Sequence, residues 1–110
     1  MPFRLLTAAS LLLAALAAQA QAQTVEYFPV PEGAHPHDVA PAPDGTVWYT
    51  AQGQGALGLL DPESREVKQI PLGENSAPHG VIVGPDGAAW VTDGGLNAIV
   101  RVDPRTHAVK

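Results

Sequence analysis

The 110-residue chain contains no cysteine, few basic residues and no long amphipathic helix. Without cysteine no disulfide can form, so the fold has to hold together by packing alone. Six Lys and Arg stand against 11 Asp and Glu, which gives a net charge of −5. Because no basic cluster is present, this balance argues against nucleic acid and anionic membranes as partners. Beyond residue 20 no apolar period of 3.6 persists, which excludes long helices.

Residues 1–20 have the pattern of a cleavable export signal. Arg4 precedes a mostly apolar run, and small residues then follow at alternate positions, at Ala18, Ala20 and Ala22. The apolar run covers 14 residues (5–18), fewer than the roughly 18 to 20 that a membrane-spanning helix needs. We therefore predict cleavage near residue 20 or 22, a periplasmic or secreted protein, and no stable membrane anchor. An uncleaved anchor is the open alternative.

The sequence is rich in internal repetition. Residues 25–66 align with residues 67–108 at a shift of 42 without a gap, and 15 of the 42 pairs are identical. The identical pairs gather in a few motifs: Pro36-His37 with Pro78-His79, Pro43-Asp44-Gly45 with Pro85-Asp86-Gly87, Trp48 with Trp90, and Asp61-Pro62 with Asp103-Pro104. A period of about 40 to 45 residues with several short strands is typical of propeller blades.

Each repeat predicts four antiparallel strands joined by tight turns. In the first repeat the strands are expected at 37–42, 46–50, 56–60 and 66–71, and in the second at 79–83, 88–92 and 98–102. Pro-Asp-Gly and Asp-Pro supply the turns, because Pro presets φ, Asp binds nearby backbone N–H groups and Gly accepts positive φ. We predict an all-β fold: a partial β-propeller of about two four-stranded antiparallel blades, after an N-terminal signal helix.

The alignment of the two repeats also predicts where each repeat begins and ends. Residues 25–66 form repeat 1, and residues 67–110 form repeat 2, which is expected to be truncated. Residues 25–29 align with the outer strand at 67–71, which predicts an orphan outer strand. Repeat proteins generally need about three or more units to bury their faces. We therefore expect the chain to need further blades or self-assembly, and to be inactive alone.

Two segments resemble blades of the virginiamycin B lyase (streptogramin lyase) family: HPHDVAPAPDGTVWYTAQGQGALGLLDP and APHGVIVGPDGAAWVTDGGLNAIVRVDP. That family's blades read P-x-G-I, G-P-D-G, W-F-T-E and N-x-I-G-R-I, and the resemblance covers residues 25–110. It implies a seven-bladed ring and an enzyme that opens the lactone of a cyclic depsipeptide antibiotic by elimination, with Mg²⁺. The last motif is degraded here, to GALGL at 55–59 and NAIVR at 97–101.

The resemblance also implies candidate catalytic residues. His37 and His79 each follow a proline, lie one repeat apart and match the two histidines of the lyase site. Asp93 is the acid nearest to the place of the family's glutamate. It differs in being an aspartate and in its offset from Trp90, and the family's working pair lies in its last two blades, whereas these are the first two.

The residues themselves leave two interpretations open for each candidate. A neutral imidazole of His37 or His79 at the inner end of a blade could take a proton next to a carbonyl group. Alternatively, each Pro-His could fill its loop and bond the neighbouring blade's backbone. Asp93 could orient a histidine or bind a cation, or it could cap the Asp93-Gly94-Gly95 bend.

Other polar and aromatic residues carry weaker expectations. His35 and His37 would face one side of an extended strand and could share a metal, although two ligands do not make a site. His107 is expected to be exposed, and Trp48 and Trp90 to pack between blades. A small molecule or a cyclic peptide is the expected ligand. The alternatives to a lyase are a non-catalytic secreted propeller module that binds a ligand or partner, and a lactonase related to gluconolactonases.

Overall fold

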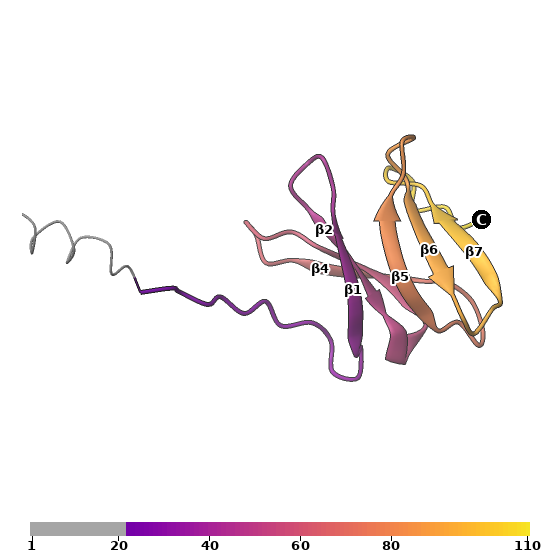
Figure 1. Ribbon diagram of the computed structural model, residues 1–110, viewed down its shortest axis with the longest axis horizontal. Coiled ribbons are helices and arrows are strands. Elements are labelled where there is room, and N and C mark those ends of the chain that lie inside the picture. Colours follow the sequence, from indigo (N-terminus) through magenta and orange to yellow (C-terminus); the bar gives the residue numbers. More distant parts are fainter. Residues whose placement is uncertain (1–21) are drawn as a thin grey trace, which may run out of the picture.

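The computed structural model describes residues 22–110, which form two antiparallel β-sheets packed against each other (Figure 1). The first sheet has the order β1 (Pro36–Pro41), β2 (Val47–Ala51), β3 (Ala56–Leu60) and β4 (Val67–Pro71), with a short 3-10 turn η1 (Gln52–Gln54) between β2 and β3. The second sheet has the order β5 (Pro78–Val83), β6 (Ala89–Asp93) and β7 (Ala98–Val102). The prediction of an all-β partial propeller is confirmed. The predicted signal, residues 1–20, lies outside the described residues.

The turns form where the sequence places them. Gly45 and Gly87 have φ values of 90° and 78°, which glycine adopts without strain. The Asp44 carboxylate accepts the Thr46 N–H at 2.9 Å, and in the next turn Asp61 accepts the Glu63 N–H at 2.9 Å. These local hydrogen bonds end one strand and start the next, so the predicted strands agree with the observed ones to within about two residues.

The second sheet also contains the start of a fourth strand. Val102 forms an isolated antiparallel bridge with Val109, and Arg101 exchanges two backbone hydrogen bonds of 2.9 Å with Lys110. These contacts correspond to the pairing of β3 with β4 in the first sheet. Each sheet is therefore built on the same four-strand plan.

The main core lies between the two sheets. Trp48, Leu57 and Ile70 of the first sheet pack with the valines of the second, Val81, Val91, Val100 and Val102. Because side chains alternate along a strand, one face of β2 and β3 supplies these residues and the other faces away. The expected packing between blades is confirmed for Trp48, which is 2% exposed.

Trp90 does not share this environment. It holds the same repeat position as Trp48 but is 37% exposed, because it lies on the face of the second sheet that points away from the first. The described residues include no second sheet over this face, so for Trp90 the expected packing between blades stays a prediction. The position of a residue within a repeat fixes the face it occupies, but only a neighbouring sheet can bury that face.

One further expectation is corrected. His107 is half-buried instead of exposed, since its ring lies edge-on to Trp48 with centroids 6.2 Å apart.

Residues 25–29 pair with no strand among the described residues, so the orphan outer strand stays a prediction. Arg65 contacts this segment: it forms an ion pair with Glu26, donates to the Tyr27 carbonyl at 3.4 Å and lies 4.8 Å from the centre of the Phe28 ring.

Within residues 22–110, none of the helical segments has the length and apolar character needed to cross a bilayer.

Candidate functional site

The candidate site lies where the inner strands β1 and β5 begin, and both strands are irregular there. The pairing of β1 with β2 shifts between Pro36 and Val39, and the pairing of β5 with β6 shifts between Pro78 and Gly80. Such a bulge bends the strand and redirects its side chains. It falls on the Pro-His dipeptide in both blades, because proline has no N–H to give to the ladder.

At each bulge, the hydroxyl of a threonine on the neighbouring strand accepts a hydrogen bond from a backbone N–H. The Asp38 N–H donates to the Thr50 hydroxyl at 3.0 Å, and in the second blade the Gly80 N–H donates to the Thr92 hydroxyl at 2.9 Å. The fully buried Thr50 also donates its hydroxyl hydrogen to the His79 carbonyl at 2.9 Å. One side chain thus fixes the backbone next to His37 and the backbone of His79.

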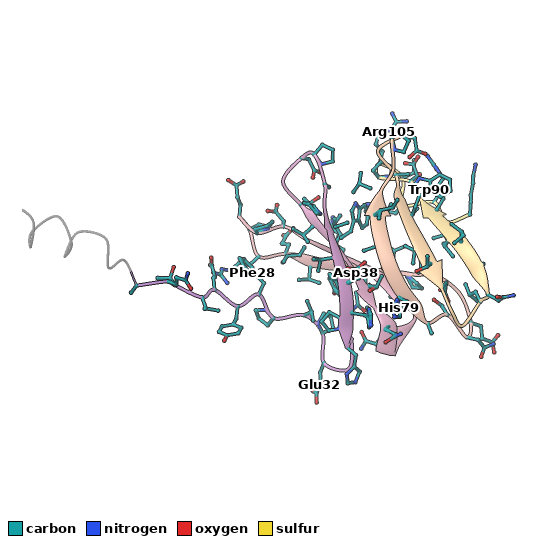
Figure 2. All side chains as sticks on the ribbon, in the orientation of Figure 1. Phe28, Glu32, Asp38, His79, Trp90 and Arg105 are labelled. Atoms are coloured by element: carbon teal, nitrogen blue, oxygen red, sulfur yellow. The ribbon has the colours of Figure 1, made fainter. Side chains whose placement is uncertain are left out.

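The structure brings His37 and His79 together. Their ring centroids lie 3.7 Å apart, with the ring planes inclined at 39°. Both side chains are exposed, and each comes from the inner strand of its own blade. Figure 2 shows His79 and Asp38 near the ends of the inner strands where the two sheets meet. We call His37 and His79 the histidine pair.

Asp38 is a member of this region that the sequence did not single out. One of its carboxylate oxygens accepts the Val81 N–H at 2.9 Å across the two blades. Hydrogen bonds from the Val81 and Val39 backbone, and more weakly the two nearby imidazoles, lower the pKa of Asp38. Asp38 does not recur in the repeat, because glycine occupies the equivalent position, Gly80, in the second blade. The comparison of the two repeats therefore could not identify it.

Asp93 lines a hollow of about 580 Å³ together with His79. Its carboxylate is 3% exposed and accepts three hydrogen bonds: from the Ala77 N–H at 2.9 Å, from the Leu96 N–H at 3.0 Å and from the Ser76 hydroxyl. Burial raises its pKa most strongly, but these hydrogen bonds together outweigh burial and leave the pKa below its ordinary value. The carboxylate therefore holds the loop before β5 and the turn after β6.

The residues present do not form a metal site by themselves. His35 has a φ of 45° and precedes β1, so the expectation that it shares an extended strand with His37 is wrong. Within residues 22–110, no three His, Cys, Asp or Glu side chains gather closely enough to bind a metal ion. Mg²⁺ prefers oxygen ligands, and the carboxylates of Asp38 and Asp93 are occupied by backbone donors. The donor set on these residues does not fit Mg²⁺.

Thr50→Val tests the link between the blades. We expect a loss of about 1–3 kcal/mol in the free energy of unfolding, because valine leaves the part-buried Asp38 N–H and the His79 carbonyl without this partner. Thr92→Val is the matched control, since that exposed hydroxyl serves one N–H, and a smaller loss is expected. Urea unfolding followed by circular dichroism measures both, and equal losses would contradict the inter-blade role.

Solved structures show the same fold. A streptogramin B lyase matches with a TM-score of 0.71 and 23% identity over 77% of this chain and 28% of its own. The virginiamycin B lyase from Staphylococcus aureus matches with a TM-score of 0.71 and 22% identity over 84% of this chain and 31% of its own. Hydrazine synthase from Kuenenia stuttgartiensis matches with a TM-score of 0.63 and 17% identity, over 81% of this chain and 26% of that one.

These matches establish the propeller fold of the chain. The chain spans about 30% of the length of the lyase structures. No protein-family model and no curated protein sequence matches it. The resemblance to virginiamycin B lyase blades that the sequence motifs carry therefore extends to the three-dimensional fold.

Proposed function

We propose that the chain carries the proton-removing histidine pair of a lyase-like propeller that acts on the lactone of a cyclic depsipeptide. The observation behind this proposal is the approach of His37 and His79 to a centroid distance of 3.7 Å on adjacent inner strands. A catalytically inactive virginiamycin B lyase with the same fold holds quinupristin. The predicted export signal at residues 1–20 supports a location in the periplasm or outside the cell as part of this proposal.

The reaction proposed is an elimination. An imidazole of the pair takes the proton from the carbon next to a carbonyl group, and imidazole is the side chain that exchanges protons near neutral pH. The electron pair of that C–H bond forms a carbon–carbon double bond, while the adjacent carbon–oxygen bond of the lactone breaks. The oxygen leaves as a carboxylate, so the ring opens without water. His37 packs on His79 and limits the orientations of both rings.

The chain by itself is expected to form no ring-opened product. Elimination also needs groups that hold the substrate and stabilise the charge developing on it. The candidate acid Asp93 is committed to three hydrogen bonds within its own blade. The histidine pair is exposed to solvent. Residues 22–110 therefore supply the proposed base but not the groups that hold the substrate and stabilise its charge.

Proton removal can be tested separately from ring opening. Quinupristin is incubated with the chain in D₂O, and its mass is followed by mass spectrometry while its binding is followed by NMR. We expect deuterium to enter at the carbon next to the carbonyl group faster than in buffer, with no ring-opened product. This gain should be lost in His79→Ala and kept in His107→Ala, whose ring lies against Trp48. Absence of both binding and exchange would contradict the proposal.

A non-catalytic binding propeller is the second candidate function. The observation in its favour is again Asp93, because a structural carboxylate leaves the hollow beside His79 without a free acid. The same experiment separates the two functions. Quinupristin that shifts the NMR signals of His37 and His79 without deuterium exchange would support binding alone, and would contradict the lyase-like proposal.

A further inference from the structure

Asp38 ties the inner strand of the second blade to the inner strand of the first, next to the histidine pair. Its Oδ2 atom accepts the Val81 N–H at 2.9 Å. A Cβ atom at Gly80 would lie 3.7 Å from the same oxygen. The carboxylate therefore lies against the backbone that joins His79 to Val81.

A second contact from the first blade holds the same segment. The Thr50 hydroxyl accepts the Asp38 N–H at 3.0 Å and donates to the His79 carbonyl at 2.9 Å. The segment from His79 to Val81 is thus held by Thr50 at its start and by Asp38 at its end. Because His37 directly precedes Asp38 in the chain, these bonds also fix the place of one imidazole relative to the other.

Few other charged groups face the histidine pair. The elements packed against β1 and β5 are β2, β6 and η1, and their titratable side chains are Tyr49 and Asp93. Tyr49 is buried on the other face of the first sheet, Asp93 is bonded within its own blade, and His35 lies against Gly53 of η1. These elements contain no lysine or arginine, and Asp38 forms no ion pair among residues 22–110. The carboxylate of Asp38 is therefore the charge available to the pair.

A carboxylate in this place matters for a base made of two imidazoles. Two like charges in contact repel each other, so the pair gains a single positive charge when it takes up a proton, and a nearby negative charge favours that form. Backbone hydrogen bonds from Val81 and Val39 lower the pKa of Asp38 most, and the imidazoles of His37 and His79 lower it further. The carboxylate and the two rings are therefore within electrostatic reach of one another.

We propose that Asp38 is the positioning residue of the histidine pair: it holds His79 against His37 through Val81, and it stabilises the positive charge that the pair acquires on removing a proton. This inference rests on the proposed function, because proton removal from the substrate creates that charge. Asp38 acts through the two histidines. Glycine takes its place in the second blade, at Gly80, so the two repeats supply this carboxylate once.

The charge can be tested without substrate, by following the NMR signals of the histidine rings as a function of pH. In Asp38→Asn the amide oxygen can still accept the Val81 N–H, but the negative charge is gone. Since the positive charge of the pair then lacks its partner, the signals of His37 and His79 should change at a pH lower by about half a unit than in the parent. The difference should shrink in about 1 M salt, which screens exposed charges. A carboxylate that only held the backbone would leave both quantities unchanged.

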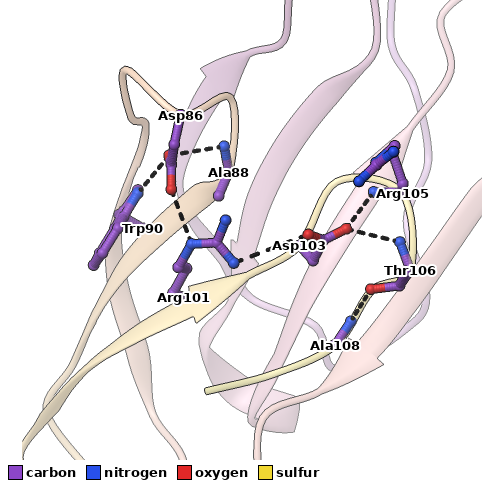
Figure 3. Close-up of polar contacts among 8 residues, drawn as sticks. All are labelled: Asp86, Ala88, Trp90, Arg101, Asp103, Arg105, Thr106 and Ala108. Atoms are coloured by element: carbon purple, nitrogen blue, oxygen red, sulfur yellow. Dashed lines mark hydrogen bonds and ion pairs between the residues drawn. The ribbon is translucent and has the colours of Figure 1, made fainter.

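Asp103→Asn is the matched control. The Asp103 carboxylate also accepts backbone hydrogen bonds, from the Arg105 and Thr106 N–H groups at 2.9 Å each (Figure 3). It follows the end of β7 that lies away from His79, because β7 and β5 pair with β6 in opposite order from that end. Removing this charge should leave the pH at which the His79 signals change as it is in the parent.

Deuterium exchange into quinupristin measures the effect on proton removal. Asp38→Asn should slow the exchange about threefold, the factor that corresponds to half a pH unit. Asp38→Ala should slow it more, because it also leaves the Val81 N–H without its acceptor. Asp103→Asn should exchange as fast as the parent.

The two measurements distinguish the inference from the proposed function. A parent chain that exchanges no deuterium contradicts the proposed function, while the titration of the substrate-free chain still decides whether Asp38 acts on the pair. A parent that exchanges deuterium, with an Asp38→Asn variant that exchanges equally fast, overturns the role of Asp38 alone. Ring signals of His37 and His79 that change at the same pH in Asp38→Asn and in the parent also overturn it.

Discussion

Replacing Trp48 with alanine is expected to lower the free energy of unfolding by about 3–5 kcal/mol, because the change deletes a large side chain from the interface between the sheets. The Trp48 side chain is 2% exposed and packs among the valines of the second blade, with the His107 ring against its edge. A loss of that size removes a large share of the stability of a domain of about 90 residues without disulfides. Urea unfolding followed by far-ultraviolet circular dichroism measures it, since tryptophan fluorescence changes with the substitution itself.

The repeat supplies a control for this prediction. Trp90→Ala removes the same residue type from the same repeat position, but Trp90 is 37% exposed. Its loss costs one hydrogen bond to Asp86 and a weak contact with Arg101, and we expect about 1 kcal/mol. Equal losses in the two variants would contradict the packing of the sheets through the Trp48 face.

The strands were predictable because local chemistry and the repeat agree. Pro-Asp-Gly and Asp-Pro place the turns, and the Asp44 and Asp61 carboxylates bond the backbone within two residues of themselves. Interactions of this range are visible in a short stretch of sequence. The 42-residue period then assigns the same strand order to both blades, and the structure confirms it for the seven strands.

Burial was less predictable, because it depends on what lies opposite a residue. Trp48 and Trp90 are equivalent in the repeat, yet only Trp48 faces a second sheet. Residues 25–29 align with β4, but among the described residues no strand lies beside them to pair with, so the alignment alone does not show where they pack. A repeat alignment predicts the strand and the sheet face on which a residue lies. The contacts between repeats decide whether that face is buried.

The candidate site was predictable only in part, for the same reason. The repeated Pro-His dipeptide identified His37 and His79, and the structure places their rings in contact. The role of Thr50 was missed, although its recurrence as Thr92 was the available signal, because its bond to His79 spans 29 residues. Two of the three partners of Asp93 also lie far away in the sequence, at residues 76 and 77 on the preceding loop, whereas the Leu96 N–H matches the local cap that the sequence suggested.

Asp93 gives the second large expected effect. Asp93→Ala should lower the free energy of unfolding at neutral pH by about 2–4 kcal/mol, because it leaves the Ala77 and Leu96 N–H groups and the Ser76 hydroxyl without their acceptor in a buried position. Asp93→Asn is the conservative partner, since its amide oxygen can still accept from the backbone, and it should lose less. Urea unfolding at neutral pH measures both, and an Asp93→Ala variant as stable as the parent would show that these bonds contribute nothing.

The pH dependence of the same variants tests the charge itself. The folded chain lowers the pKa of Asp93, so its ionised form stabilises the fold at every pH above the ordinary carboxyl value of about 3.9. This stability is lost as the pH falls through the lowered pKa of the folded state, where the carboxylate takes up a proton.

Asp38, Asp44, Asp86 and Asp103 also have lowered pKa values, so the parent as a whole loses stability in acid. The difference between the parent and Asp93→Asn isolates one group: it should be largest at neutral pH and shrink as the pH falls below the ordinary carboxyl pKa and through the lowered pKa of the folded state. A difference that stays constant across this range would assign the role of Asp93 to its shape and not to its charge.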